Sequence, residues 1–357
     1  MERTKWPLGM LAAAMLAVVP GAMAGSMGDV RWSGFLSAGG AVSDTETLYN
    51  ESVDKEGSFN LTRFGLNAAA DVDATWSLAA QIVNHGFGEE ISFDWGYATY
   101  HHGDAVDIKL GKIKYPNGLL SEVVDVGAAY PWVRPPQEFY SLSPLGSIML
   151  LESYRGAALV FKSQLSNADL EFEPFYGNTD LDDEPDSQLR KILGLRASVG
   201  NDVFKVQAAY SQANMAMASG VTRDMLDGQD QSVWTVGGSL NWNNVIGYAE
   251  YGSYSVSDFA EFDTTAGYVT VGYQFGLITP LLTFASFDQD SGLGQDSVTL
   301  GMRYQLSPSV AVKGEWQSIQ PKERDSAIAG ETPAGLFEEM PDEDRVNVVN
   351  LVVDFVF

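Results

Sequence analysis

Histidines are the side chains of this sequence best suited to acid–base catalysis or to metal binding, and there are three of them. His101 and His102 stand in a predicted short turn, and His85 lies at the far end of a neighbouring strand. No G-x-S-x-G or H-E-x-x-H motif surrounds them, and the absence of cysteine excludes a thiol site. A Ser-His-acid group assembled from distant positions stays open. We interpret the histidines as surface residues and predict no catalytic residue, no enzymatic activity and no cofactor.

A second candidate is the acidic stretch DLDDEPD at residues 180–186, whose carboxylate oxygens could hold a hard cation. Pro185 occupies the place where an EF-hand loop has its tight-turn glycine, so the stretch departs from that pattern. We favour a solvated acidic loop and keep a metal site at Asp180, Asp182 and Asp183 as the alternative.

Charged residues on the polar faces of predicted strands are the third candidate. Seven bases fall on the face that would point into a barrel, opposite a long segment whose Glu122, Asp125 and Arg134 would stand in the channel. Acids facing bases across a narrow aqueous gap create a transverse field that passes small polar solutes and discriminates against apolar ones. Alternatively, the bases simply pair with acids of the wall, namely Asp94, Asp107, Glu171, Glu173 and Glu315. The predicted pore residues are Arg63, Lys109, Glu122, Asp125, Arg134, Lys162, Arg196, Lys205, Arg303 and Lys313.

The elements that must position these charges are β-strands. In residues 297–306, Val298, Leu300, Met302 and Tyr304 share one face, with polar residues on the other. Residues 204–212 and 233–242 repeat the pattern, and aromatic side chains cluster at the ends of the apolar faces. Aromatic ends are typical of membrane interfaces, and 9 to 11 residues is about the length of a tilted membrane strand.

Sixteen such segments are predicted, and the connections between them alternate in length. Short turns on one side and long acidic loops on the other are the plan of an outer-membrane barrel, and an even count places both termini on the short-turn side. A soluble barrel or sandwich also alternates and is the alternative. The facing of the segment at 245–253 is ambiguous because of Glu250. The segments lie near residues 30–41, 61–70, 76–84, 91–100, 106–112, 156–163, 169–177, 191–199, 203–212, 232–242, 245–253, 265–275, 278–287, 296–306, 310–317 and 345–357.

The connection between the fifth and sixth segments is the longest and is rich in apolar and aromatic residues. Such a segment is too apolar to extend into water, so we expect it to fold into the barrel lumen and narrow the passage. The last segment ends on Phe357, with Phe355 on the lipid face and Asp354 on the watery face. It must pair with the first segment, because an open strand edge is not tolerated in a bilayer.

The N-terminal residues of the chain indicate export, and its net charge limits its partners. Arg3 and Lys5 precede an apolar stretch that ends in Ala22-Met23-Ala24, so residues 1–24 are predicted to be a cleaved signal peptide and residues 25–357 the barrel domain. An exported chain without cysteine has no disulfides to stabilise it. A net charge of −26 excludes nucleic acid as a partner.

Sixteen alternating strands, a long third loop containing Pro116-Asn117-Gly118 and the terminal Phe357 together resemble the Gram-negative general porins, over residues 25–357. The resemblance implies a homotrimer in the outer membrane, in contact with lipopolysaccharide, with a pore in each barrel constricted by the third loop. It also implies passive diffusion of small hydrophilic solutes and ions, and a terminal aromatic recognised by the barrel assembly machinery. Arg134 and two prolines in mid-loop depart from the usual acidic loop motif.

The expected function is therefore a channel with a mild preference for cations, because acidic outer loops concentrate cations at a pore mouth. These carboxylates could also bind divalent cations that bridge to anionic lipid headgroups. Alternatives are a porin specific for phosphate or a carboxylate, an outer-membrane barrel hydrolase and a soluble exported β protein. The acids of the last outer loop are Glu323, Asp325, Glu331, Glu338, Glu339, Asp342, Glu343 and Asp344.

Overall fold

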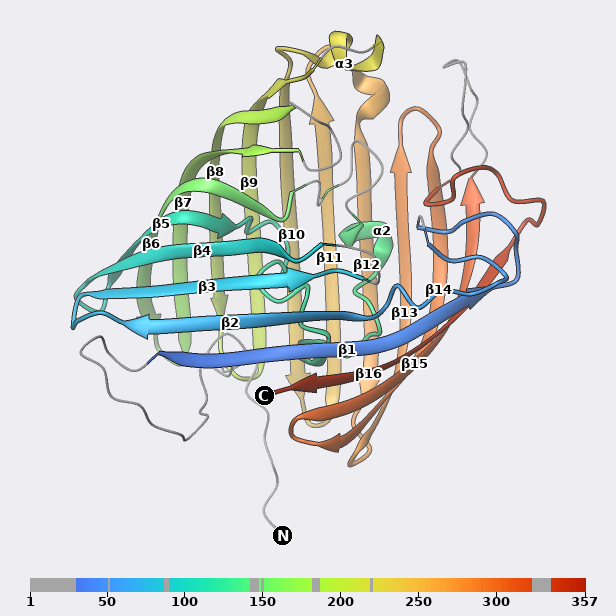
Figure 1. Cartoon of the computed structure of the whole chain (residues 1–357), viewed down its shortest axis with the longest axis horizontal. Coiled ribbons are helices and arrows are strands. Elements are labelled where there is room, and N and C mark those ends of the chain that lie inside the picture. Colours follow the sequence, from blue (N-terminus) through green and yellow to red (C-terminus); the bar gives the residue numbers. More distant parts are fainter. Residues whose placement is uncertain are drawn as a thin grey trace.

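The computed structural model describes residues 30–50, 52–86, 90–141, 148, 151–181, 187–218, 221–322 and 335–357. Within these ranges, sixteen antiparallel strands follow one another around a single closed barrel (Figure 1). The predicted all-β barrel of sixteen strands is confirmed, while the predicted signal peptide lies outside the described residues. The strands are β1 (Arg31–Ser43), β2 (Arg63–Asp71), β3 (Trp76–Asn84), β4 (Ser92–His102), β5 (Val106–Lys114), β6 (Ser153–Leu165), β7 (Ala168–Asp180), β8 (Gln188–Gly200), β9 (Phe204–Ala216), β10 (Asp230–Trp242), β11 (Val245–Val256), β12 (Thr264–Tyr273), β13 (Ile278–Gln289), β14 (Gly294–Ser307), β15 (Val310–Lys322) and β16 (Val346–Val356).

The barrel closes where the last strand pairs with the first. Phe35 stands opposite Val356, and the antiparallel register continues to Ser43 opposite Val348. Gly34 and Phe357 extend the ladder, because each backbone N–H donates to the other residue's carbonyl oxygen, at 3.0 and 3.1 Å. The predicted closing strand is confirmed, and the chain leaves no unpaired edge between its ends.

Strand residues alternate between an exposed apolar face and a buried, largely polar one. On β16, Val349, Leu351 and Phe355 are exposed, whereas Asn350 and Asp354 are buried. A closed wall whose apolar side faces outward is what a bilayer requires, because lipid replaces the protein core on that side. The facing predicted for the last strand is confirmed.

The surroundings of Asp354 differ from the prediction of a carboxylate in lumen water. Asp354 is only 1% exposed, its Oδ2 lies 2.8 Å from the ammonium of Lys313, and the Ser37 hydroxyl donates to its Oδ1 at 2.6 Å. Gly127, which belongs to the connection between β5 and β6, packs directly on this group, and a Cβ there would collide with both Asp354 and Ser37. The carboxylate is therefore dry because another part of the chain covers it.

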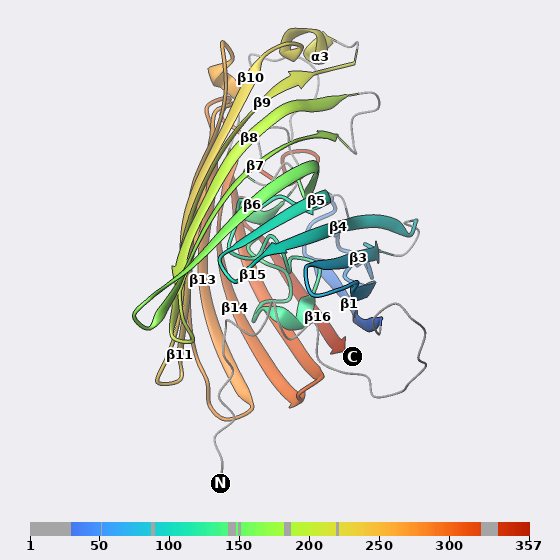
Figure 2. The same cartoon turned by 90° about the vertical axis from the view of Figure 1, so that its left-hand side faces the viewer.

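The connections alternate in length as predicted. β10 and β11 are joined by Asn243 and Asn244, both left-handed with φ of 48° and 71°, and Gly276 with φ of 63° turns the chain between β12 and β13. Figure 2 shows tight hairpins at one end of the barrel, while the short helix α3 (Val221–Leu226) lies at the other. None of the helices in the described ranges is long and apolar enough to cross a membrane.

The longest connection runs from residue 115 to residue 152 and is called the β5–β6 segment below. Its described residues, 115–141, 148 and 151–152, include the short helices η2 (Gly127–Ala129) and α2 (Gln137–Tyr140). Many of its side chains are buried, and Trp132 and Phe139 are 2% and 0% exposed. The segment thus supplies much of the buried apolar surface of the protein.

Candidate pore constriction

Side chains on the buried face of β9–β13 hold the first half of the β5–β6 segment and its central tryptophan. The Tyr115 hydroxyl donates to Ser211 on β9 at 2.5 Å, and the Gln207 amide donates to the carbonyl oxygen of Gly118 at 3.0 Å. Farther along, the indole N–H of Trp132 donates to Thr270 on β12 and Thr283 on β13, at 3.2 and 3.0 Å. Partners on several strands fix this backbone in one position.

Glu250 on β11 is the strongest single anchor of the segment. Its two carboxylate oxygens accept a hydrogen bond from the Leu119 backbone N–H at 2.7 Å and from the hydroxyls of Tyr140 and Tyr268, the latter at 2.7 Å. The residue is 4% exposed, so its carboxylate depends on these donors in place of water. Sequence reasoning left the facing of Glu250 ambiguous, and an acid in an otherwise regular strand was the available signal of this role.

Two of the predicted pore bases bind backbone carbonyl groups of the segment. The Lys313 ammonium donates to the carbonyl oxygens of Gly127 and Trp132, both at 2.6 Å. The Arg303 guanidinium donates to those of Tyr130 and Ala128, at 2.7 and 3.0 Å. The Gly127 carbonyl oxygen also accepts a long backbone hydrogen bond from Tyr130 at 3.5 Å, and the two cations add charged donors to this turn.

A third predicted base, Arg63, donates to the Tyr130 hydroxyl. Arg134 is half-buried and lines a cavity of about 20 Å³ together with Glu138 and Glu315. Burial raises the pKa of Glu138 above its ordinary value. These residues therefore lie where the segment meets the wall.

The predicted acid Asp125 is buried, at 3% exposed, instead of facing open water. Its Oδ2 lies 2.9 Å from the Lys114 ammonium, and its Oδ1 lies 3.1 Å from Nε2 of His85. Desolvation would raise the pKa of Asp125, but the charge of Lys114 and the hydrogen bond with His85 lower it. Asp125 is therefore held as a carboxylate at the base of the segment.

Glu122 is the acid of the segment that remains exposed, and among the described residues it has no hydrogen bond or ion pair. Desolvation raises its pKa, but attraction by Lys109, Arg196 and Lys205 is stronger and lowers it below the ordinary value. These bases belong to β5, β8 and β9, so one acid of the segment faces three bases of the wall. Glu122 and these three bases are four of the ten residues that the sequence predicts to line a pore, and that role stays a prediction.

The three wall bases differ in how far they are neutralised. Arg196 donates to Glu173 at 2.5 and 2.8 Å and to Glu171 at 2.9 Å, and Lys109 lies 3.9 Å from Glu173. Lys205, by contrast, has no hydrogen bond or ion pair within the described part of the chain. Of the four charged side chains, Glu122 and Lys205 are thus the two with no direct partner among the described residues.

Lys162 lies apart from these four side chains, at the short-turn end of the barrel, where it pairs with Asp107. Asp107 Oδ1 also lies 2.7 Å from Nδ1 of His101, whose Nε2 lies 3.0 Å from the Ser77 hydroxyl. The sequence did not predict this Ser-His-Asp series, because the three residues come from three strands and match no local motif.

The remaining predicted sites are placed as follows. Asp180 forms a 2.6 Å ion pair with Arg155, whereas Asp182 and Asp183 lie outside the described residues. Phe355 and Phe357 are exposed at the end of the closing strand, and their role as an assembly signal stays a prediction.

Comparison with known proteins identifies the family. The family model described as "Gram-negative porin" matches residues 12–323. No curated protein matches the sequence. The fold is similar to that of an anion-selective porin from Comamonas acidovorans, with a TM-score of 0.62 and 13% identity over 92% of this chain and 99% of that one. It is also similar to the outer membrane channel DcaP of Acinetobacter baumannii, with a TM-score of 0.59 and 12% identity over 95% of this chain and 100% of that one. The trimer form of OmpT from Vibrio cholerae gives a TM-score of 0.56 and 12% identity over 93% of this chain and 100% of that one. Because the family model covers most of the chain and the fold is a closed sixteen-stranded barrel, the protein belongs to the Gram-negative porin family, whose members form outer-membrane channels for small solutes.

Proposed function

We propose that ions and small hydrophilic solutes cross the outer membrane through the gap between Glu122 and the bases Lys109, Arg196 and Lys205. The supporting observation is an asymmetry of contacts. Most of the β5–β6 segment is hydrogen-bonded to β9–β15, whereas Glu122 stays exposed toward β5, β8 and β9. In this proposal the segment lies in the lumen, fills one side of it and leaves a charged aqueous passage on the other.

The proposed selectivity is a mild preference for cations. The three bases at the gap stand near three acids, Glu122, Glu171 and Glu173, so the constriction itself favours neither sign strongly. The last outer loop adds exposed carboxylates at one mouth, and a mouth of one sign concentrates the opposite ion. Those within the described residues are Glu338, Glu339, Asp342, Glu343 and Asp344.

Planar-bilayer recording of the purified protein tests this function. Under a KCl gradient at roughly 10–50 mM salt, we expect a reversal potential that indicates cation selectivity. This potential should shrink toward zero near about 1 M salt, because screening shortens the reach of the charges. An anion-selective reversal potential at low salt would contradict the cation preference, and the absence of conductance would contradict the channel. Block by phosphate at millimolar concentration or below would favour a solute-specific porin.

We propose a homotrimer as the assembly. The family resemblance implies it, and the OmpT structure described above is a trimer form. The outer surface of β2–β5 supports it with a shallow apolar hollow lined by Ala68, Ala70, Ala80, Ala98 and Leu110, where small side chains would allow close approach of another barrel. Current steps in groups of three would support three pores per particle.

A second candidate function rests on the Ser77–His101–Asp107 series, whose order of contacts is that of a serine hydrolase. An oxyanion hole requires free backbone N–H groups beside the nucleophile. Ser77 lies inside β3, which is paired with β2 on one side and β4 on the other, so neighbouring N–H groups are engaged in the sheet. We therefore expect the hydroxyl to be unreactive.

Labelling with a fluorophosphonate checks this expectation. The native barrel should give no more adduct than a Ser77→Ala variant, as read by intact-protein mass spectrometry. Stoichiometric labelling that disappears in Ser77→Ala and in His101→Asn would instead establish that Ser77 is the nucleophile of a hydrolase.

A further inference from the structure

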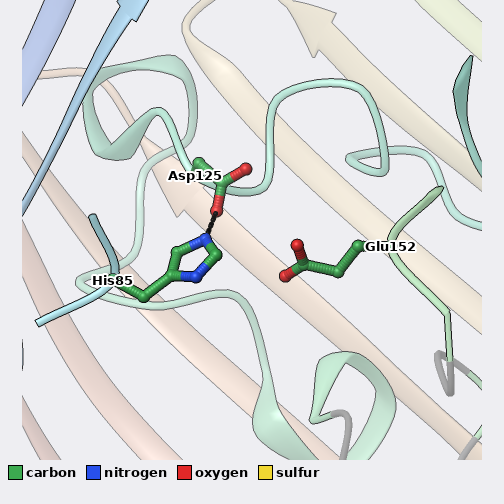
Figure 3. Close-up of side chains that lie close together, drawn as sticks. All are labelled: His85, Asp125 and Glu152. Atoms are coloured by element: carbon green, nitrogen blue, oxygen red, sulfur yellow. Dashed lines mark hydrogen bonds and ion pairs between the residues drawn. The ribbon is translucent and has the colours of Figure 1, made fainter. Parts of the chain in front are cut away.

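At the base of the β5–β6 segment, three potential metal ligands converge from three parts of the chain. His85 follows β3, Asp125 belongs to the segment, and Glu152 directly precedes β6. One ligand atom from each lies within 4.8 Å of the others. Figure 3 shows the Glu152 carboxylate pointing toward the His85 ring, and Asp125 hydrogen-bonded to Nε2 of the same ring. None of these contacts is needed for the proposed passage at Glu122.

The charges around this cluster favour an added cation. Among the described residues, Lys114 is the lysine or arginine within ion-pair distance of Asp125, Asp94 and Glu152, at 2.9, 2.8 and 3.7 Å. With a neutral imidazole, three carboxylates therefore face one ammonium group. Asp94 and Asp125 are nearly inaccessible to water, at 4% and 3% exposed, so their excess negative charge is poorly solvated. Arg63, which also attracts Asp125, already donates to Tyr130.

Lys114 leaves room for a metal ion on the other side of Asp125. The ammonium contacts Oδ2, while Oδ1 faces Nε2 of His85 at 3.1 Å. A metal between these two atoms would take the place of the proton that they share. Ligands of a tetrahedral Zn²⁺ lie about 3.4 Å apart at bond lengths of about 2.1 Å, so small side-chain rotations would close the cluster. The His85 and Glu152 side chains are 42% and 25% exposed, which gives an ion access from water.

We propose that His85, Asp125 and Glu152 bind a divalent transition-metal ion, with water completing its coordination. One imidazole nitrogen with two carboxylates suits Zn²⁺, Co²⁺ or Mn²⁺ better than Mg²⁺ or Ca²⁺, which prefer all-oxygen sites. The ion links the end of β3 to the first half of the β5–β6 segment, through Asp125, and to its end, through Glu152. It therefore secures the base of the segment, away from the gap at Glu122.

Titration of the folded, detergent-solubilised barrel with Co²⁺ tests the site. We expect one equivalent to bind, with visible d–d absorption bands, and Zn²⁺ to displace it. His85→Gln and Glu152→Gln should each weaken binding by about tenfold or more, with the channel conductance retained. His101→Gln is the matched control, because His101 also contacts an aspartate. It lies near the end of β4, whereas His85 lies in the connection before the start of β4. This control variant should leave Co²⁺ binding unchanged.

Two outcomes would overturn the proposal. One is an absence of Co²⁺ and Zn²⁺ binding in a wild-type protein that conducts normally. The other is binding that persists at wild-type strength in His85→Gln and Glu152→Gln. Because conductance is measured on the same samples, failure of the metal site can be separated from failure of the channel.

Discussion

Replacing Glu122 with glutamine is expected to shift the reversal potential of the channel toward anions, and replacing Lys205 with glutamine to shift it toward cations by a similar amount. In the proposed passage both side chains face the same gap, and neither has a hydrogen bond or ion pair in the described part of the structure, so removing either one changes the net charge that a passing ion meets. Two unit charges about 6 Å apart in water interact by about 0.7 kcal/mol, with opposite sign for a cation and an anion, so each variant should change the cation-to-anion permeability ratio by up to about tenfold.

Reversal potentials under a low-salt KCl gradient measure this pair of shifts, and both should diminish as salt is raised. Glu56→Gln and Lys55→Gln are matched controls, because they remove the same charges from exposed positions between β1 and β2. We expect smaller shifts from the controls. If Glu122→Gln and Lys205→Gln shift the potential in the same direction, or no more than the controls, the proposed passage is wrong.

Replacing Lys313 with methionine is expected to destabilise the barrel by about 3–5 kcal/mol, because it leaves the Asp354 carboxylate buried without its cation. The variant also removes the donor to the carbonyl oxygens of Gly127 and Trp132, so the β5–β6 segment should become looser. Urea unfolding followed by tryptophan fluorescence measures the first effect. Increased noise of the open channel measures the second.

A double variant separates the buried charge from the lost hydrogen bonds. Adding Asp354→Asn to Lys313→Met removes the unpaired carboxylate, so the double variant should be more stable than Lys313→Met alone. Lys322→Met is the matched control: Lys322 pairs with Asp288 and Asp296 on the exposed surface, where such a loss costs about 1 kcal/mol or less. A Lys313→Met barrel as stable as the Lys322→Met control would refute the anchoring role.

The barrel itself was largely predictable, because strand alternation is a local property of the chain. Side chains of a strand point to opposite faces with period two, so the pattern in residues 297–306 already indicates which face meets lipid. Met302 and Leu300 are indeed exposed on β14, and Ser297 is buried. The same rule placed Phe355 outward and Asp354 inward on the closing strand.

The environment of each inward charge was not predictable, because it depends on which distant residues the β5–β6 segment brings to it. Ten residues were predicted to line the pore. The structure places Lys109, Arg196 and Lys205 where their charges act on Glu122, but places Arg303 and Lys313 against backbone carbonyl groups of the segment. Alternation gives the same inward direction to Lys205 and Lys313, although Lys205 has no hydrogen bond or ion pair among the described residues and Lys313 is 1% exposed.

By itself, therefore, the sequence determined the number of strands, their facing and the closure of the barrel, all of which follow from period-two patterning and turn spacing. Only the tertiary structure decided which charges are exposed to water and which hold the segment to the wall. The physical reason is the separation along the chain between the residues that set each feature. Facing is set by neighbouring residues, whereas the pairing of Lys313 with Asp354, or of His85 with Asp125, requires contacts between segments far apart in the chain.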